Sequence, residues 1–493
     1  MRLRSVFSRH PLHILLASAL ALAACSGNAP PDTQGDDDDD DQQADAATPP
    51  PTGPDADLTQ PDAATPPPGT PDAATPPPGT PDAAVPPPNP DASVPPPTNC
   101  GDGSGTVGVP FASHPHPYAS GIIKPAHSQS QLDQEVKDFY DTWKDAYVGD
   151  GCGQGRYLIL TGMEDSKTVS EAHGYGMVIA AYMAGYDPQA KTIFDGMYKY
   201  YLAHQSVNTP FLMAWSQNSS CVNNQGPDSA TDGDLDIAYA LLLADKQWGS
   251  GGAIDYRAAA DKIMDAIRAG EVDSSAHWIL LGDWAAPGDS QYNATRTSDF
   301  MPDHLASYAA ATGDGDWTTL LDAEYTMVGK LQQMFAGATG LLPDFVVTPS
   351  NPSPAPGGFL ESASDGRYGY NACRDPWRLG VHAIVSGDAR ARSAAGKLSD
   401  WIAGATGGDP GGIRAGYQLN GNPAGNSDYT DMCFVAPFGV AAMVGSSHQA
   451  WLNSVWDFTV GEGPEGYYQD TVKLLSMIAM SGNWWTPESI SCD

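Results

Sequence analysis

Residues 130–146 of this chain, SQLDQEVKDFYDTWKDA, carry the pattern that decides its fold class. Leu132, Val136 and Tyr140 recur at intervals of four residues, so they lie on one face of an α-helix. Ser130 is the predicted N-cap, because a serine hydroxyl can accept a hydrogen bond from an unpaired amide of the first turn. The stretch therefore predicts an amphipathic helix with one buried face.

Eleven further stretches of similar pattern follow this one. They lie at 172–185, 189–203, 233–247, 256–269, 302–312, 318–335, 376–386, 390–403, 436–445, 448–458 and 467–481. Loops rich in Gly, Pro, Asp and Asn separate them, and the alternation of period two that marks strands is scarce. The periodicity predicts an all-α domain of about twelve helices over residues 100–493 and disfavours a β-sandwich or a parallel-sheet fold.

Two acidic stretches stand at the beginning of predicted helices. The first, Ser170-Glu171-Ala172-His173-Gly174-Tyr175-Gly176-Met177, combines one carboxylate with two glycines that let another segment approach closely. The second, Ala230-Thr231-Asp232-Gly233-Asp234-Leu235-Asp236, holds three carboxylates in five residues. Helix dipoles and N-caps explain such placements structurally. Carboxylates held apart in a cleft also suit glycosidic bond cleavage, in which one protonates the leaving oxygen and another activates water.

Both stretches resemble signatures of glycoside hydrolase family 8, the inverting endo-glycanases that include cellulases, mixed-linkage glucanases and chitosanases. The likeness extends over nearly all of 105–493, including Ala244-Asp245-Lys246-Gln247-Trp248, Tyr467-Tyr468-Gln469-Asp470 and Ser481-Gly482-Asn483-Trp484-Trp485. The resemblance implies that the helices form an (α/α)6 barrel of six inner and six outer helices. It also implies a substrate cleft across one end of that barrel.

The resemblance implies that Glu171 is the general acid. A helix N-terminus lowers the pKa of a carboxyl group, whereas a general acid needs a raised one, so burial or a second carboxylate must oppose the dipole. His173 departs from the family's usual residue and either tunes the acid or packs. Asp232, the predicted cap of a helix beginning near Gly233, is expected to contact a distorted sugar and support the acid. Asp234 and Asp236 are expected to be helix-start charges.

The general base is expected from a different loop. The stretch 368–378, YGYNACRDPWR, resembles a family segment in which many members carry an aspartate base at the position of Asn371. A neutral amide cannot take a proton from water, so Asn371 cannot do this. The departure places the chain with the branch in which a loop glutamate supplies the base, and Glu361, at the end of the loop 348–361, fits that description. Asp365 is the competing candidate.

Six side chains are expected to bind sugar. Trp215, Trp284 and Tyr370 match cleft aromatics of the family, although a tryptophan in a helical protein is more often a core residue. Asp228 is expected to contact sugar hydroxyls or an amino group. Arg374 is expected to brace a carboxylate or to bind substrate. Asn371 completes this expected substrate-binding set.

The N-terminal residues indicate export. Arginines precede a mostly apolar run from Leu12 to Ala24, which is too short to span a bilayer and is typical of a secretory signal. Its end, Leu22-Ala23-Ala24-Cys25, resembles a bacterial lipoprotein cleavage site. Residues 1–25 are therefore predicted to be a lipoprotein-type signal with Cys25 lipidated, which implies an outer-membrane or cell-surface location. Ordinary cleavage, with Cys25 a bystander and the protein secreted, is the alternative.

Residues 26–99 predict a tether. They contain no Lys, Arg or Trp, and the decapeptide PDAATPPPGT occurs at 61–70 and again at 71–80. Such a segment cannot bury enough apolar surface to fold, and its prolines favour extended polyproline II. It is predicted to be a disordered Pro/Asp/Ala-rich link to a catalytic domain at 100–493.

Charge and cysteine content narrow the partners further. Of 59 acids, 14 lie in the tether, and of 24 bases, three lie in the signal, so 45 acids and 21 bases leave the domain near −24. This charge argues against nucleic acid or an anionic membrane surface as a partner. Besides Cys25, six of the seven cysteines remain, which predicts up to three disulfides, including a clasp between Cys100 and Cys492. No metal-ligand spacing occurs, and no cofactor is expected.

The resemblance implies an inverting endo-β-1,4-glycanase, a glucanase that hydrolyses β-glucan such as cellulose or mixed-linkage glucan. A polysaccharide is the expected partner of a monomer, and a membrane is contacted only through the lipid at Cys25. A chitosanase using the same residues is the main alternative. A non-catalytic carbohydrate-binding surface lipoprotein and a structural envelope lipoprotein are disfavoured by the retained acids and cleft aromatics.

Overall fold

The computed structural model describes residues 100–425 and 427–492, so the predicted signal, Cys25 and tether lie outside the described residues. The described part contains twelve α-helices. They are α1 (Gln129–Tyr147), α2 (Ser170–Tyr182), α3 (Ala190–Ala203), α4 (Thr231–Trp248), α5 (Tyr256–Gly270), α6 (Pro302–Thr312), α7 (Gly315–Met334), α8 (Asp375–Ser386), α9 (Ala389–Ala405), α10 (Met432–Ala442), α11 (Gln449–Gly461) and α12 (Tyr467–Met480). The all-α prediction and its number of helices are confirmed.

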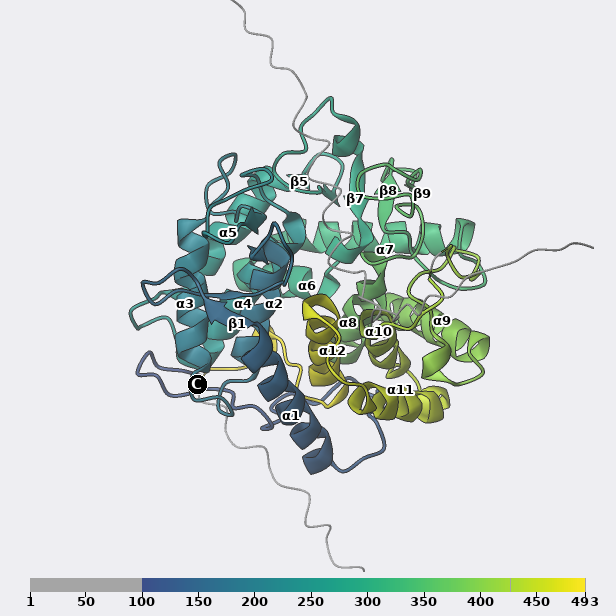
Figure 1. Ribbon diagram of the computed structural model, residues 1–493, viewed down its shortest axis with the longest axis horizontal. Coiled ribbons are helices and arrows are strands. Elements are labelled where there is room, and N and C mark those ends of the chain that lie inside the picture. The colour runs from purple at the N-terminus through teal and green to yellow at the C-terminus, as the bar shows by residue number, and fades with distance from the viewer. Residues whose placement is uncertain (1–99, 426, 493) are drawn as a thin grey trace, which may run out of the picture. The chain divides into compact units, whose positions relative to one another are not determined.

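The helices form two concentric rings (Figure 1). The even-numbered helices pack on one another in the order α2, α4, α6, α8, α10 and α12, and α12 returns to α2, which closes the inner ring. Each inner helix packs on an outer one, α12 on α1, α2 on α3, α4 on α5, α6 on α7, α8 on α9 and α10 on α11. This is the expected (α/α)6 barrel.

The inner and outer helices differ in how much of their surface is buried, as their sequences predict. All eleven residues of α10 are buried, and its sequence MCFVAPFGVAA contains no charged residue. On α1, by contrast, Leu132, Val136, Tyr140 and Trp143 form a buried stripe while most other positions face solvent. A helix that is apolar all round must lie inside, and a helix with one apolar stripe lies on the surface.

Two helix starts differ from the sequence prediction. Ser128, not Ser130, caps α1, because its hydroxyl accepts a hydrogen bond from the Gln131 amide at 3.3 Å. Helix α10 begins at Met432, four residues before the predicted start, with Pro437 inside it. A proline within a helix removes a backbone hydrogen bond, and burial of the whole helix offsets that loss here.

Glycines bring the first two inner helices into close contact. A Cβ atom on Gly174 of α2 would lie 2.6 Å from the Asp236 Cβ atom of α4, and one on Gly233 would lie 2.5 Å from the Ser170 hydroxyl oxygen. Neither position can hold a larger residue without moving the helices apart. The glycines therefore set the spacing between the N-termini that carry Glu171 and Asp232.

Long loops gather at the N-terminal ends of the inner helices. Loops 148–169, 204–230, 271–301, 335–374 and 406–431 lead into inner helices, whereas loops 313–314 and 387–388, which leave them, are short. The strands of the described residues all lie in these long loops and pair antiparallel. They are β1 (Val148–Asp150) with β2 (Tyr157–Ile159), β3 (Thr168–Val169) with β4 (Ser216–Gln217), β5 (Val272–Asp273) with β6 (Trp278–Ile279), and β7 (Ala294–Arg296), β8 (Phe345–Val347) and β9 (Ser353–Pro354) in one sheet.

Two disulfides are present among the described residues. Cys100 pairs with Cys492, as the predicted clasp, and Cys152 pairs with Cys221, which joins two of the long loops. Cys373 and Cys433 are buried thiols, and their sulfur atoms lie 3.1 Å from the Tyr370 carbonyl oxygen and 3.4 Å from Asp431 Oδ1, respectively. This part of the chain therefore contains two disulfides, fewer than the predicted maximum of three.

We expect the clasp to stabilise the domain. It closes a loop with a sequence separation of 392 residues, and removing a native disulfide typically costs about 2–5 kcal/mol. The double substitution Cys100→Ser with Cys492→Ser should lower the melting temperature in calorimetry while leaving turnover unchanged at 25 °C. An unchanged melting temperature would show that the termini are held by packing alone.

Candidate active site

A large cleft lies over the N-terminal ends of the inner helices. Its volume is about 1400 Å³, which exceeds the usual range for small-molecule pockets and suits a segment of a polymer. All nine predicted site residues in this part of the chain line it: Glu171, Trp215, Asp228, Asp232, Trp284, Glu361, Tyr370, Asn371 and Arg374. Residues from five different loops and helix starts therefore converge on one site.

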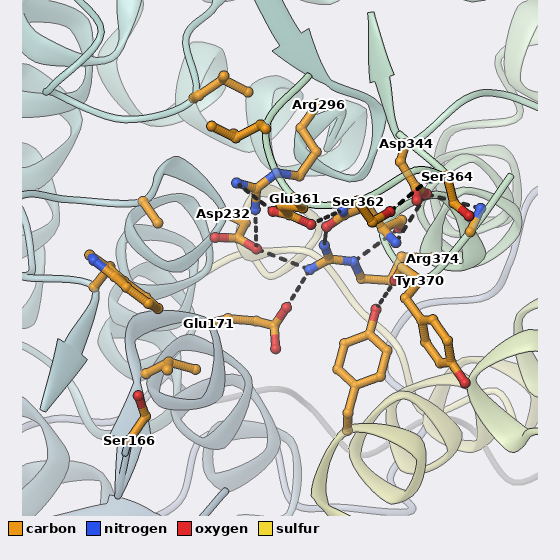
Figure 2. A pocket seen from close by; sticks show the side chains of 18 of the residues that line it. Ser166, Glu171, Asp232, Arg296, Asp344, Glu361, Ser362, Ser364, Tyr370 and Arg374 are labelled. Atoms are coloured by element: carbon orange, nitrogen blue, oxygen red, sulfur yellow. Dashed lines mark hydrogen bonds and ion pairs between the residues drawn. The ribbon is translucent and has the colours of Figure 1, made fainter. Parts of the chain in front are cut away.

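The Arg374 guanidinium lies at the centre of the polar network on the cleft floor (Figure 2). Its Nη1 donates to Glu171 Oε2 at 2.7 Å and to Asp232 Oδ2 at 3.0 Å. Its Nη2 donates to Asn371 Oδ1 at 3.0 Å. Arg374 is only 1% exposed, so these charged hydrogen bonds are largely shielded from water. Arg374 therefore contacts two carboxylates, in agreement with its predicted bracing role.

Glu171 is the second residue of α2 and reaches the cleft with 18% of its side chain exposed. Tyr467, the first residue of α12, donates its hydroxyl hydrogen to Glu171 Oε1 at 2.9 Å. Burial raises the pKa of Glu171, and the negative charge of Asp232 raises it further, against the opposing effects of Arg374 and Tyr467. Burial thus outweighs the helix dipole, which by itself would lower the pKa of Glu171.

Asp232 does not cap its helix. Helix α4 begins at Thr231 with Ala230 at the N-cap position, so Asp232 is the second helical residue. Its side chain is 3% exposed, and Oδ2 lies 3.0 Å from Arg374 Nη1 and 3.5 Å from Arg296 Nη1. Ion pairing with two arginines, rather than capping, explains this aspartate.

Asp234 and Asp236 are not exposed helix-start charges, because both are buried. Asp236 accepts hydrogen bonds from Arg378 Nη2 at 2.6 Å and interacts with His304 Nε2 at 2.8 Å, and these partners lower its pKa to about 2. Asp234 accepts a hydrogen bond from the Met213 amide at 2.8 Å. Asp234 does lie in the first turn of α4, as predicted, but the sequence did not reveal that both carboxyl groups are buried, because burial depends on what the neighbouring helices place beside them.

Asp234 lies against a second buried carboxyl group, Glu271. Burial raises the pKa of Glu271 to about 8, with a further contribution from the charge of Asp283. Burial likewise raises the pKa of Asp234 well above its ordinary value, and the charge of Glu271 adds to this shift. The pair therefore holds a proton at neutral pH that the unfolded chain would release.

This pair predicts a pH-dependent stability. A carboxyl group whose pKa is raised by folding binds its proton more tightly in the folded state, so stability falls as pH rises from about 4.3 to about 8. Glu271→Gln keeps a hydrogen-bond donor without the ionisation, and its melting temperature should fall less between pH 5 and pH 8 than that of the wild type. The exposed Glu164→Gln is the control, and equal slopes for both variants would contradict the shared proton.

Glu361 lies in the loop between β9 and α8 with 19% of its side chain exposed. Asn371 Nδ2 donates to Glu361 Oε2 at 2.8 Å, and Arg296 Nη2 lies 3.8 Å from Oε1. The Asn371 amide thus bridges Glu361 and Arg374. An aspartate at position 371 would place two carboxylates in contact, so the amide is the residue type that this pairing requires.

The predicted sugar-binding aromatics are half-buried along the cleft. Trp215 donates its indole hydrogen to the Gln225 carbonyl oxygen at 3.2 Å, and the Tyr370 hydroxyl donates to Asp431 Oδ2 at 3.0 Å. Trp284 packs against the apolar cluster beneath the β7–β8–β9 sheet. Each of these three aromatic rings therefore combines a packed edge with a surface toward the cleft.

Burial and the nearby charge of Asp283 raise the pKa of Asp228, another predicted sugar-binding residue, to about 6.

The sequence analysis did not single out several residues that line this cleft, among them Arg296, Asp344, Tyr467 and Tyr468. Tyr467 and Tyr468 are the first two residues of the last predicted helix. They belong to a stretch that resembles family 8, and this resemblance could have pointed to them. Arg296 ends the short strand β7 and Asp344 directly precedes β8, and nothing in their local sequence marks them. His173, in contrast, turns away from Glu171 and interacts through Nε2 with the Met197 carbonyl oxygen at 2.8 Å, so it packs.

Residues 100–425 and 427–492 contain neither a candidate metal site nor a candidate membrane-spanning helix. No group of three or more His, Cys, Asp or Glu side chains there is placed to hold a metal ion. No helix in the same residues combines the length and apolar character needed to cross a membrane.

Comparison with known proteins identifies the family. The model of "Glycosyl hydrolases family 8" matches residues 126–482, which is most of the described domain. The chain belongs to glycosyl hydrolase family 8. It is accordingly a glycoside hydrolase, and the family inferred from the two acidic stretches is confirmed.

Relatives of this family 8 enzyme match it over nearly their whole length. A β-glucanase of Niallia circulans is 50% identical over 379 residues, which cover 76% of this chain and 91% of that protein. An endoglucanase of Bacillus sp. (strain KSM-330) is 40% identical over 379 residues, covering 75% and 80%. The apo structure of a β-1,3-1,4-glucanase from Paenibacillus sp. X4 is 50% identical with a TM-score of 0.74, covering 76% of this chain and 99% of that one.

Proposed function

We propose that this family 8 enzyme is an inverting endo-β-glucanase that cleaves β-1,4 bonds in soluble β-glucan, with mixed-linkage glucan as the first substrate to test. Relatives at 50% and 40% identity are named β-glucanase and endoglucanase, and a solved structure at 50% identity is a β-1,3-1,4-glucanase. The observation that carries the proposal is the pairing in one cleft of Glu171, with its raised pKa, and Glu361, held by Asn371.

Glu171 is the general acid in this proposal. Its proton passes to the glycosidic oxygen as the bond from that oxygen to the anomeric carbon breaks. The cleft floor holds three carboxylates, Glu171, Asp232 and Glu361, against the two guanidinium groups of Arg374 and Arg296. Burial raises the pKa of Glu171, and this shift favours the protonated form that a general acid needs.

Glu361 is the general base. It accepts a proton from a water molecule that attacks the anomeric carbon from the face opposite the leaving oxygen, so the configuration inverts. Inversion requires the two carboxyl groups to be about 6.5–9.5 Å apart, which leaves room for this water. Asn371 occupies the position of the aspartate base found in many family members, and its amide orients Glu361 by the 2.8 Å hydrogen bond.

Asp232 and Arg374 are positioning groups for the acid in this proposal. Asp232 holds Arg374, which in turn contacts Glu171, so the three side chains are fixed relative to one another. The half-buried rings of Trp215, Trp284 and Tyr370 present faces on which sugar rings can stack.

The substrate class is tested by reducing-sugar release from mixed-linkage glucan, carboxymethyl cellulose, xylan and chitosan. Mixed-linkage glucan should give the highest turnover, with viscosity falling before much reducing sugar appears, as internal cleavage requires. Highest turnover on chitosan would favour the chitosanase alternative. Binding to glucan without release from any substrate would indicate a carbohydrate-binding protein that has lost catalysis.

For the location of the enzyme, we propose attachment to the cell surface through a lipid on Cys25, on the basis of the Leu22-Ala23-Ala24-Cys25 sequence. Metabolic labelling with a radioactive fatty acid should mark the wild type and not Cys25→Ser. Release of the unlabelled wild-type protein into the medium would instead support ordinary cleavage and secretion.

A further inference from the structure

We propose that Asp365 is a positioning residue that fixes the catalytic base, because its carboxylate holds the backbone on both sides of Glu361. This inference rests on the proposed role of Glu361 as the base. Asp365 itself touches neither the cleft nor its contents, since it is 1% exposed and absent from the cleft lining. Its carboxylate is therefore not placed to act on water.

Asp365 accepts three backbone hydrogen bonds from consecutive residues. The amides of Leu360 and Glu361 donate to Oδ2 at 2.7 and 3.1 Å, and the Ser362 amide donates to Oδ1 at 2.6 Å. One buried carboxylate thus fixes the peptide planes before and after the Cα atom of Glu361. Charge-assisted hydrogen bonds of this kind are about twice as strong as neutral ones.

The backbone of Asp365 ties this loop to the barrel. Its carbonyl oxygen accepts a hydrogen bond from the Phe345 amide of β8 at 2.9 Å. Phe359 and Leu360 pack on Phe345 and on the small apolar cluster that also supports Trp284. Strand β8 pairs with β7, in the register that sets Arg296 opposite Phe345. The loop is therefore anchored to the same sheet that carries Arg296, the cation nearest to Glu361 in this network.

A second buried aspartate holds the partner of Glu361 in the same way. Asp344 Oδ1 accepts hydrogen bonds from the amides of Gly369, Asn371 and Ala372 at 3.0, 3.1 and 2.7 Å. Asp344 lies immediately before β8, and Asp365 binds the first residue of that strand. The backbones of Glu361 and Asn371 are thus both anchored at one end of β8. This shared anchor maintains the geometry of the 2.8 Å hydrogen bond between their side chains.

The test compares Asp365→Asn with Asp273→Asn, Glu171→Gln and Glu361→Ala. An asparagine has one oxygen acceptor in place of two, so at least one of the three amides loses its partner and Glu361 shifts. A misplacement of about 1 Å can cost about a hundredfold in rate, so kcat should fall about ten- to hundredfold while KM stays unchanged. Asp273→Asn is the matched control, because Asp273 accepts the Ser275 and Ala276 amides at 3.0 and 3.1 Å in a hairpin away from the cleft. Both amides reach Oδ1, the one oxygen that an asparagine keeps, so this substitution should leave kcat unchanged.

An activated aryl glycoside separates a base defect from an acid defect. Its leaving group needs no proton, so it should restore the rate of Glu171→Gln but not that of Asp365→Asn or Glu361→Ala. If Asp365→Asn does not fold, Asp365→Glu, which keeps the charge and moves it by one methylene, is measured in the same way.

The outcomes distinguish this inference from the proposed function. A wild-type kcat for Asp365→Asn beside an inactive Glu361→Ala would overturn the positioning role and leave the base assignment intact. Restoration of Asp365→Asn by the activated substrate would also overturn it, since the defect would then lie in the acid step. An active Glu361→Ala would contradict the proposed base itself.

Discussion

Replacing Glu361 with alanine should abolish hydrolysis of every polysaccharide substrate, with a loss of about a hundredfold to ten-thousandfold in kcat, the scale of general base catalysis. The reason is that Asn371, which contacts Glu361, is an amide that donates to its carboxylate and cannot take a proton. The carboxylate oxygens of Asp365 already accept hydrogen bonds from three backbone amides, so Asp365 is not placed to replace Glu361. No replacement base is therefore placed beside Glu361 among the residues that contact it.

Asn371→Ala is the matched control for this substitution. It removes the hydrogen bonds to Glu361 and Arg374 but leaves the base in the cleft, so it should impair turnover without abolishing it. Azide should restore part of the rate of Glu361→Ala, because a small anion can occupy the space of the missing carboxylate. Proton NMR should show inverted configuration in the product or azide adduct. A retained anomer, or an active Glu361→Ala, would require another base or another mechanism.

Glu171→Gln should fold normally and lose at least about a hundredfold in turnover on a natural polysaccharide. Glutamine keeps the hydrogen bond from Tyr467 but cannot supply a proton to the glycosidic oxygen. Calorimetry should show a melting temperature close to that of the wild type. Near-wild-type turnover would remove Glu171 from the mechanism.

The same substitution makes a second, pH-dependent prediction. Burial raises the pKa of Glu171, so the acid stays protonated at pH values where an exposed glutamate is ionised, and activity should fall as pH rises through this raised pKa. The alkaline decline in kcat/KM should therefore be present in the wild type and absent from Glu171→Gln assayed with an activated aryl glycoside. An unchanged decline in the variant would assign it to a different group.

Local sequence carried the fold class and most of the predicted site. The apolar spacing of residues such as Leu132, Val136 and Tyr140 predicts helices directly, because burial of one face is what makes each helix stable. The glycines beside Glu171 predict close helix packing, which Gly174 provides against Asp236 of α4. The arrangement of the helices as a barrel came from family resemblance, and the ring closure of α12 on α2 confirms it.

Only the tertiary structure decided how the charges are paired. The sequence by itself determined that Glu171 and Asp232 are present, but their shared partner Arg374 is 203 residues from Glu171 and 142 residues from Asp232. Whether an aspartate in a first helical turn caps, pairs or shares a proton depends on what the neighbouring helix places beside it. Asp234 and Asp236 lie in one short acidic run, yet burial beside Glu271 raises the pKa of the first, and pairing with Arg378 lowers that of the second. Electrostatic free energies depend on distance and burial, and folding alone sets both.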